Sequence, residues 1–155
     1  MGQPLALYEP LLNKDDNMKK NIANKWVEAL ESGNYQQVDG QLKSKVNDKQ
    51  CGYCCLGVLC DLYIKETGKG KWQKAADGSH DRKFVGNKSE SAVLPKEVMQ
   101  WAGIKSAEGE LKVPVSYGIL GDESNQANSL VSLNDDARFK FKQIAKVIKE
   151  QAAHL

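Results

Sequence analysis

The chain has 155 residues, of which 41% are hydrophobic and 27% are charged, a composition typical of one ordinary folded domain. Its 22 basic and 20 acidic residues give a formal net charge of +2, too weak a field to indicate binding to duplex DNA or to an anionic membrane. No apolar run approaches the roughly 20 residues that cross a bilayer, so a membrane protein is excluded at this stage.

The N-terminal residues 1–17 combine two prolines with a polar stretch, and we expect them to form an irregular arm ahead of a single globular domain over residues 18–155. No secretion signal is recognisable in them, which predicts a cytoplasmic protein. From Met18 the apolar residues recur at helical spacing until Ser32, which predicts the first helix, with Gly33 as its left-handed stop.

The middle of the chain holds one apolar segment between two polar ones. Residues 34–50 are polar and predict a turn with a short hairpin, whereas residues 51–67 are apolar nearly all round and predict a central helix that ends at Gly68. Residues 68–91 contain four glycines and few bulky apolar side chains. We expect them to form a long loop, with residues 69–88 as the most mobile internal segment.

The last third predicts two more helices and two short strands. A helix follows Leu94-Pro95 and ends at Gly103, and strands are expected over residues 111–115 and 129–133. A final helix is expected over residues 136–152. Helices outweigh strands, so the predicted fold class is α+β: one compact, helix-rich domain with a small antiparallel sheet.

All four cysteines of the chain lie within ten residues, so they cannot join distant segments by disulfides. Tetrahedral zinc needs four ligands, and the two histidines of the chain are not in paired spacing. We expect no metal and no cofactor, and we expect three of these thiols to be buried and reduced within the central helix: Cys54, Cys55 and Cys60.

No known catalytic motif is present. We therefore predict a binding protein without catalytic residues. One alternative stays open. His80 is flanked by Asp77 and Asp81 and could act as a general base in a small hydrolase or transferase that acts on a nucleotide. The simpler interpretation of this stretch is a charged loop.

Residues 69–88 interleave cations with aromatic rings, a combination that could hold a nucleotide, since rings stack on bases while cations bind phosphates. Arg82 is the only fork-shaped cation among them. The predicted ligand-binding residues here are Lys71, Trp72, His80 and Arg82. The alternative is that the aromatic side chains only fasten the loop to the core.

Several segments together resemble a family of small proteins common in tailed-phage and prophage genomes. They are Trp26–Gln37, Cys54–Leu62, Leu94-Pro95 with Trp101–Gly103, and Leu133–Asp135 with the helix that follows. The resemblance implies a phage context and no particular chemistry. Physically, Gly57 would let a neighbouring element pack closely on the central helix, and Asn134-Asp135 would cap the last helix. Tyr35 and Gln37 are predicted to face a binding groove.

These observations predict a phage-encoded, non-enzymatic binding protein in the host cytoplasm that sequesters either a nucleotide immune signal or a host defence protein. A pocket with convergent polar groups would indicate the small ligand, and a broad exposed apolar patch would indicate the protein partner. A structural role in the virion is a third alternative. The oligomeric state, and whether residues 69–88 or 33–42 form the binding surface, are left open.

Overall fold

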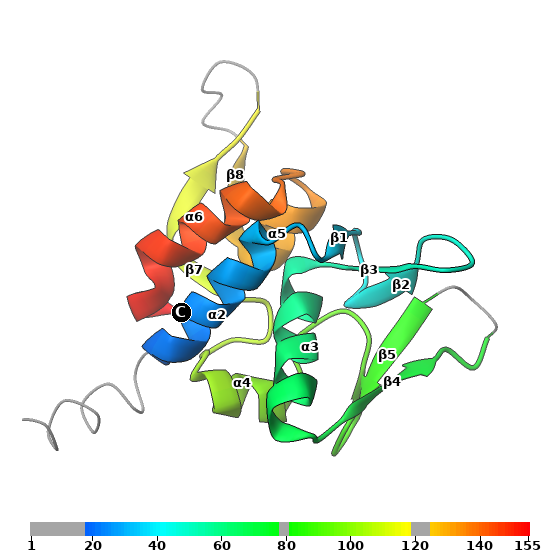
Figure 1. Cartoon of the computed structure of the whole chain (residues 1–155). Helices are drawn as coiled ribbons and strands as arrows, with labels where there is room; N and C mark the ends of the chain where they lie inside the picture. The colour runs from blue at the N-terminus through cyan, green and yellow to red at the C-terminus, as the bar shows by residue number, and fades with distance from the viewer. Residues whose placement is uncertain (1–17, 78–80, 119–124) are drawn as a thin grey trace, which may run out of the picture.

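The structure is a computed structural model that describes residues 18–77, 81–118 and 125–155 (Figure 1). It confirms the predicted α+β class. The α-helices in the described residues are α2 (Lys20–Glu31), α3 (Cys55–Thr67), α4 (Lys96–Ala102), α5 (Leu130–Asp135) and α6 (Phe141–Gln151), which η2 (Ala152–His154) follows. None of these helices has the length and apolar character needed to cross a membrane.

The described strands form two sheets. The larger sheet has the order β1-β3-β2-β5-β4, with β6 paired to β5, and it is mixed because β1 runs parallel to β3. The smaller sheet is the antiparallel pair β7 and β8. The strands are β1 (Gln36–Gln37), β2 (Lys43–Lys45), β3 (Cys51–Tyr53), β4 (Lys71–Lys74), β5 (Asp81–Val85), β6 (Ser89–Glu90), β7 (Glu110–Ser116) and β8 (Gln126–Ser129).

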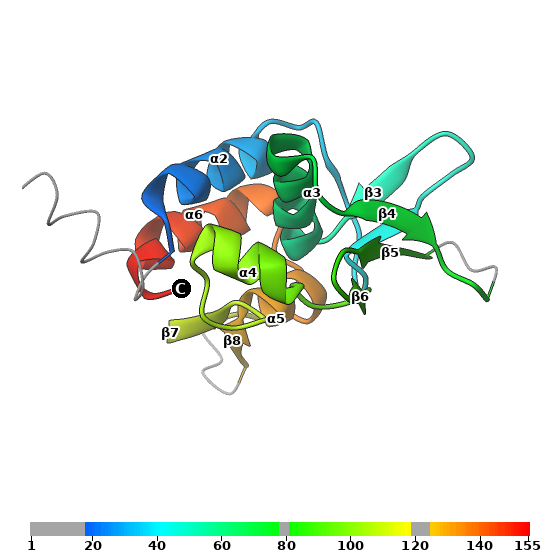
Figure 2. The same cartoon turned by 90° about the horizontal axis from the view of Figure 1, so that it is seen from below.

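Helix α3 is the centre of the molecule. Helices α2 and α6 lie side by side on one side of it, and the larger sheet lies on the other (Figures 1 and 2). Trp26 of α2 is fully buried, and its Nε1 donates a hydrogen bond of 2.9 Å to the carbonyl oxygen of Cys55 at the start of α3. Eight of the first nine α3 residues are buried because neighbours cover the helix from several sides: Cys55, Leu56, Gly57, Val58, Leu59, Cys60, Asp61 and Tyr63.

The predicted close approach at Gly57 is confirmed. A Cβ at this position would lie 1.7 Å from the carbonyl oxygen of Leu42, so only glycine lets the segment that enters β2 pass against α3. The amide of Cys54 donates a 3.3 Å hydrogen bond to the same Leu42 oxygen. This contact fixes the position of the larger sheet relative to α3.

Asn134 joins three segments in the core. Its Nδ2 donates 2.9 Å to the carbonyl oxygen of Val38, and its Oδ1 accepts from Gln37 Nε2 at 2.9 Å and from the Cys55 amide at 3.3 Å. The prediction that Asn134 caps the last helix is therefore wrong: it lies in the last turn of α5. Helix α6 is instead capped by Gln143, whose Oε1 accepts from the Lys140 amide at 2.8 Å.

Two segments differ from the prediction on the sheet side. Residues 51–53 form β3, so the central helix begins at Cys55. Residues 68–91 are not one long loop, because β4 and β5 pair in antiparallel register within them. Trp72 and Phe84 face each other in this pair, and both also contact α3, Phe84 through the ring of Tyr63 and Trp72 through Asp61.

Two boundaries differ near the C-terminus. A strand is expected from the sequence over residues 129–133, but β8 ends at Ser129 and the short helix α5 begins at the next residue. Ser129 caps this helix, because its Oγ accepts a hydrogen bond from the Ser132 amide at 3.1 Å. The last helix begins at Phe141 rather than at 136. Arg138 has a φ of 56°, a left-handed conformation that no α-helix contains.

We expect Gly57→Ala to lower the free energy of unfolding by about 3 kcal/mol or more, because the added methyl group meets backbone atoms that cannot move aside. Gly33→Ala is the control: Gly33 has open space around it but a φ of +78°, so the cost should be near 1 kcal/mol. Urea denaturation measures both. Equal losses would contradict the close packing at Gly57.

Candidate functional site

The site begins with a buried carboxylate on α3. Asp61 is 7% exposed, and its oxygens accept hydrogen bonds from Tyr35 Oη at 2.7 Å and from Trp72 Nε1 at 3.1 Å. Lys65, one helical turn along α3, places its Nζ 3.0 Å from Asp61 Oδ2. One helix residue thus holds a tyrosine from the segment before β1 and a tryptophan from β4.

These contacts keep the site in one charge state. Burial acts to raise the pKa of Asp61, but the hydrogen bonds from Tyr35, Trp72 and Lys65 outweigh it and hold that pKa below its ordinary value. Burial, followed by the hydrogen bond to Asp61, raises the pKa of Tyr35. The hydrogen bond to Tyr35 raises the pKa of Lys65. At neutral pH the carboxylate is ionised, the phenol neutral and the ammonium charged.

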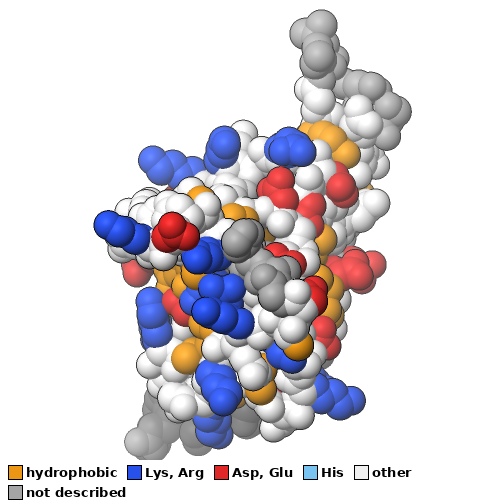
Figure 3. Space-filling model, turned by 90° about the vertical axis from the view of Figure 1, so that its right-hand side faces the viewer, with side chains coloured by type: hydrophobic (Ala, Val, Ile, Leu, Met, Phe, Trp, Pro, Cys, Tyr) orange, Lys and Arg blue, Asp and Glu red, His pale blue; other side chains and the backbone are white. Residues whose placement is uncertain are grey.

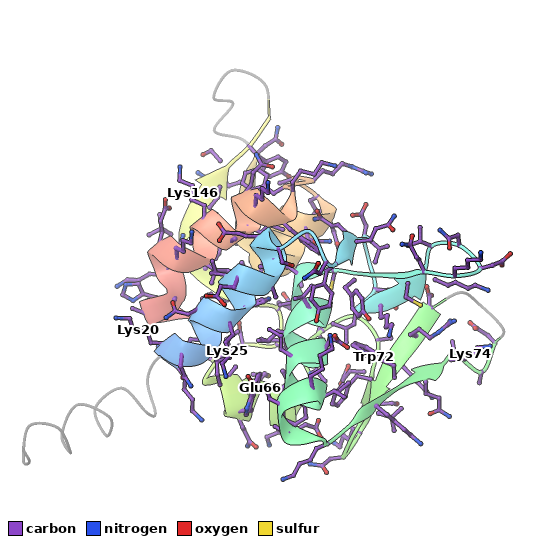
Figure 4. The ribbon with its side chains drawn as sticks, in the orientation of Figure 1. Lys20, Lys25, Glu66, Trp72, Lys74 and Lys146 are labelled. Atoms are coloured by element: carbon purple, nitrogen blue, oxygen red, sulfur yellow. The ribbon has the colours of Figure 1, made fainter. Side chains whose placement is uncertain are left out.

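Three rings surround this carboxylate: Tyr35, Tyr53 and Trp72, which we call the aromatic cluster. Tyr53 meets the edges of both neighbours, with ring centroids 5.0 Å from Tyr35 and 6.0 Å from Trp72. The Nζ of Lys43 lies 5.0 Å from the Tyr53 centroid and 5.2 Å from that of Trp72, as in a cation–π contact. Figure 4 shows Trp72 between α3 and the sheet.

A pocket of about 730 Å³ opens beside the aromatic cluster, between α2, α3 and strands β1 and β3 of the sheet. This volume suits a small ligand. Tyr35, Tyr53 and Asp61 line it together with charged residues of both signs, and Lys25 and Glu66 form a salt bridge across it (Figure 4). Its other lining residues are Glu28, Ala29, Ser32, Asn34, Gln36, Lys49, Gln50, Cys51, Leu62 and Lys65.

Three cations lie in register on the sheet next to the aromatic cluster. Lys43 of β2 pairs with Arg82 of β5, and Arg82 pairs with Lys74 of β4; we call these three the cation row. Paired residues of antiparallel strands point to the same face, and Lys43 also pairs with Tyr53, so the row continues the line of rings. Figure 3 shows basic side chains gathered on this side of the molecule, with hydrophobic side chains between them.

The structure brings together three of the six predicted ligand-binding residues: Tyr35, Trp72 and Arg82. Lys71 precedes Trp72 on β4 and pairs with Val85, so it points to the opposite face of the sheet. His80 lies outside the described residues, and the alternative in which it acts as a base stays a prediction. The neighbouring Asp81 accepts a hydrogen bond from Ser44 Oγ at 3.1 Å.

The amide of Gln37 is occupied by contacts inside the protein. Its Nε2 donates to Asn134 Oδ1 at 2.9 Å and to the Phe139 carbonyl oxygen at 2.8 Å, and its Oε1 accepts from the Phe141 amide at 3.1 Å. These bonds tie β1 to the start of α6. They leave little for a ligand, although the prediction that Gln37 binds one is not tested by them.

The burial of Cys54, Cys55 and Cys60 is confirmed, and each is a free thiol. Burial raises the pKa of Cys54 to about 11 and raises that of the other two well above the ordinary value, so none of the three is a nucleophile at neutral pH. Cys51 is part-exposed and lines the pocket. No cluster able to hold a metal ion occurs in the described ranges.

Sequence reasoning missed four residues of this site: Lys43, Tyr53, Asp61 and Lys65. Lys74 belongs to the stretch of cations and rings over residues 69–88 but was not selected from it. Tyr53 and Lys43 lie in short strands that carry no clear alternation of apolar residues. Asp61 did leave a signal, because it is a single charge inside an otherwise apolar helix, and such a residue is buried only when it is paired.

A scan of family models matches residues 18–152 to a family described as a domain of unknown function, DUF8296. The chain belongs to this family. The match spans both sheets and all the described α-helices, and so includes the aromatic cluster and the cation row. No curated protein and no solved structure matches the chain.

Asp61→Asn should lower the free energy of unfolding by about 2–3 kcal/mol at pH 7, because the ionised carboxylate accepts three hydrogen bonds in the core. The folded-state pKa lies below the ordinary 3.8, so this contribution is complete above about pH 5 and is lost as the pH falls through the folded pKa. Denaturation at several pH values should show the gap between variant and native chain closing in acid. Asp48→Asn, at an exposed carboxylate, is the control.

Gln37→Leu tests whether this side chain is structural. Three partners in the core lose their hydrogen bonds, so we expect the free energy of unfolding to fall by about 2 kcal/mol. Gln36→Leu, at the exposed neighbour on the same strand, should cost less than about 0.5 kcal/mol. Urea denaturation of the two variants measures the difference; similar small effects would contradict a structural role for the Gln37 amide.

Proposed function

We propose that this protein is a non-enzymatic binding protein whose site is the aromatic cluster with its adjoining pocket, and that the ligand is a planar, anionic small molecule of the nucleotide class. The observation that carries the proposal is the position of Tyr53. Its ring lines the pocket, contacts Tyr35 and Trp72, and lies next to Lys43 in the sheet. Rings that can stack on a base and cations that can bind a phosphate therefore adjoin one another.

The electrostatics of the site support binding rather than catalysis. A general acid or base works best when its pKa lies near the operating pH. The pKa values of Asp61, Tyr35 and Lys65 are all shifted away from neutrality, and burial raises that of Tyr53. Among the described site residues with a shifted pKa, only Lys43 moves toward neutrality, chiefly through burial.

The surface supports a small ligand over a protein partner. In the described part of the chain the large hydrophobic side chains that are exposed are Val46 and Val113, which are 40% and 59% exposed. Val46 directly follows β2 of the larger sheet and Val113 is in β7 of the smaller one, so the two do not form a broad apolar patch. A host defence protein would need such a patch or strong charge complementarity.

The biological setting is part of the same proposal. The segments that resemble tailed-phage and prophage proteins support a role in infection, and sequestration of a nucleotide immune signal in the host cytoplasm would need only tight binding. Mass spectrometry of small molecules released from the purified native protein would identify the ligand directly. A bound nucleotide is expected.

Tyr53→Leu should weaken nucleotide binding about tenfold, because it removes the ring surface while keeping an apolar side chain at the same half-buried place. Isothermal titration of adenosine and guanosine nucleotides measures the effect, and circular dichroism checks that the fold persists. Tyr117→Leu, at a part-buried tyrosine after β7, is the matched control and should bind as the native chain does. Equal affinities for the two variants would argue against the site.

A further inference from the structure

The cation row is expected to destabilise the sheet that contains it. Like charges directly opposite each other on neighbouring strands destabilise a sheet, and here three cations follow one another across β2, β5 and β4. No salt bridge in the described part of the chain includes Lys43 or Lys74. Glu90 is on the same face, but it pairs with Phe84, two residues along β5 from Arg82.

Lys43 and Arg82 each have contacts within the protein. Lys43 Nζ lies over the rings of Tyr53 and Trp72, and Arg82 Nη1 donates 3.2 Å to the backbone oxygen of Asp81. Neighbouring strands are about 4.8 Å apart, so the row extends over about 10 Å between its outer backbone positions. A row of separated cations matches an extended anion better than a compact one.

We propose that the cation row binds the chain of linked phosphates of a nucleoside diphosphate or triphosphate, while the base lies in the pocket against Tyr35 and Tyr53. This inference rests on the proposed function and names its ligand class. Tyr53 links the two parts, since it lines the pocket and is the next residue in the row after Lys43. Linked phosphates place one negative group beside each cation in turn, and the fork of Arg82 suits the central position.

The test titrates the full chain with inorganic tripolyphosphate and with orthophosphate at fixed ionic strength. Tripolyphosphate should bind at least about tenfold more tightly. Lys43→Gln, Arg82→Gln and Lys74→Gln should each weaken it about five- to tenfold. Lys71→Gln and Lys83→Gln are matched controls: they remove the same charge from β4 and β5 but on the opposite face, and should leave the affinity within about twofold.

Thermal denaturation separates a binding role from a structural one. Without ligand, Lys74→Gln should have a melting temperature equal to or above that of the native chain, because it removes a like-charge contact. Added tripolyphosphate should stabilise the native chain and not this variant. A lower melting temperature for the ligand-free variant would show that Lys74 supports the sheet, and would overturn its assignment to phosphate.

The remaining outcomes distinguish this inference from the proposed function. Equal affinity for orthophosphate and tripolyphosphate, or equal losses in row and control variants, would overturn the cation row as a phosphate site. Nucleotide binding that needs Tyr53 but not the row would overturn it while leaving the proposed function intact. Tighter binding of a cyclic dinucleotide or a single-stranded oligonucleotide than of any linear nucleoside triphosphate would overturn the ligand class. No binding of any nucleotide would overturn both.

Discussion

The hydrogen bonds to the carboxylate of Asp61 are the constraint on which the site depends. A buried carboxylate is stable only when donors surround it, and these donors come from Tyr35, Trp72 and Lys65. The need to satisfy one charge therefore fixes side chains from three places in the sequence around α3. It also holds the rings of Tyr35 and Trp72 on either side of Tyr53, which gives the aromatic cluster a defined geometry.

Two further contacts position the sheet that carries these rings. Gly57 lets the backbone at Leu42 touch α3, and Asn134 ties Val38 and Gln37 to the start of that helix. Both are short-range contacts between backbone or amide groups, which tolerate little displacement. A sheet built on strands as short as β1, β2 and β3 gains its rigidity from these attachments and not from the length of its ladder.

The sheet face carries an arrangement of charges that does not favour stability. Cross-strand pairs of opposite charge would stabilise β2, β5 and β4, yet the chain places Lys43, Arg82 and Lys74 in one row. The cation–π contacts of Lys43 with Tyr53 and Trp72 offset part of the repulsion. Proteins commonly accept such local destabilisation where a ligand is to be bound. The family match covers the whole of this surface but supplies no activity for it.

The sequence by itself determined the features that depend on local pattern. Helical spacing from Met18, glycine stops at Gly33 and Gly68, burial of the cysteines and the close approach at Gly57 all follow from residue type and period. Trp72 and Arg82 could also be selected, since a ring and a guanidinium in a polar segment are unusual.

The register of the strands could not be predicted from the sequence. Lys71 and Lys74 are three residues apart on β4 and so lie on opposite faces, and a shift of one residue in the strand pairing would exchange those faces. The partners of Asp61 were likewise decided by the tertiary structure, because a carboxylate inside an apolar helix shows that donors are needed but not which distant side chains supply them.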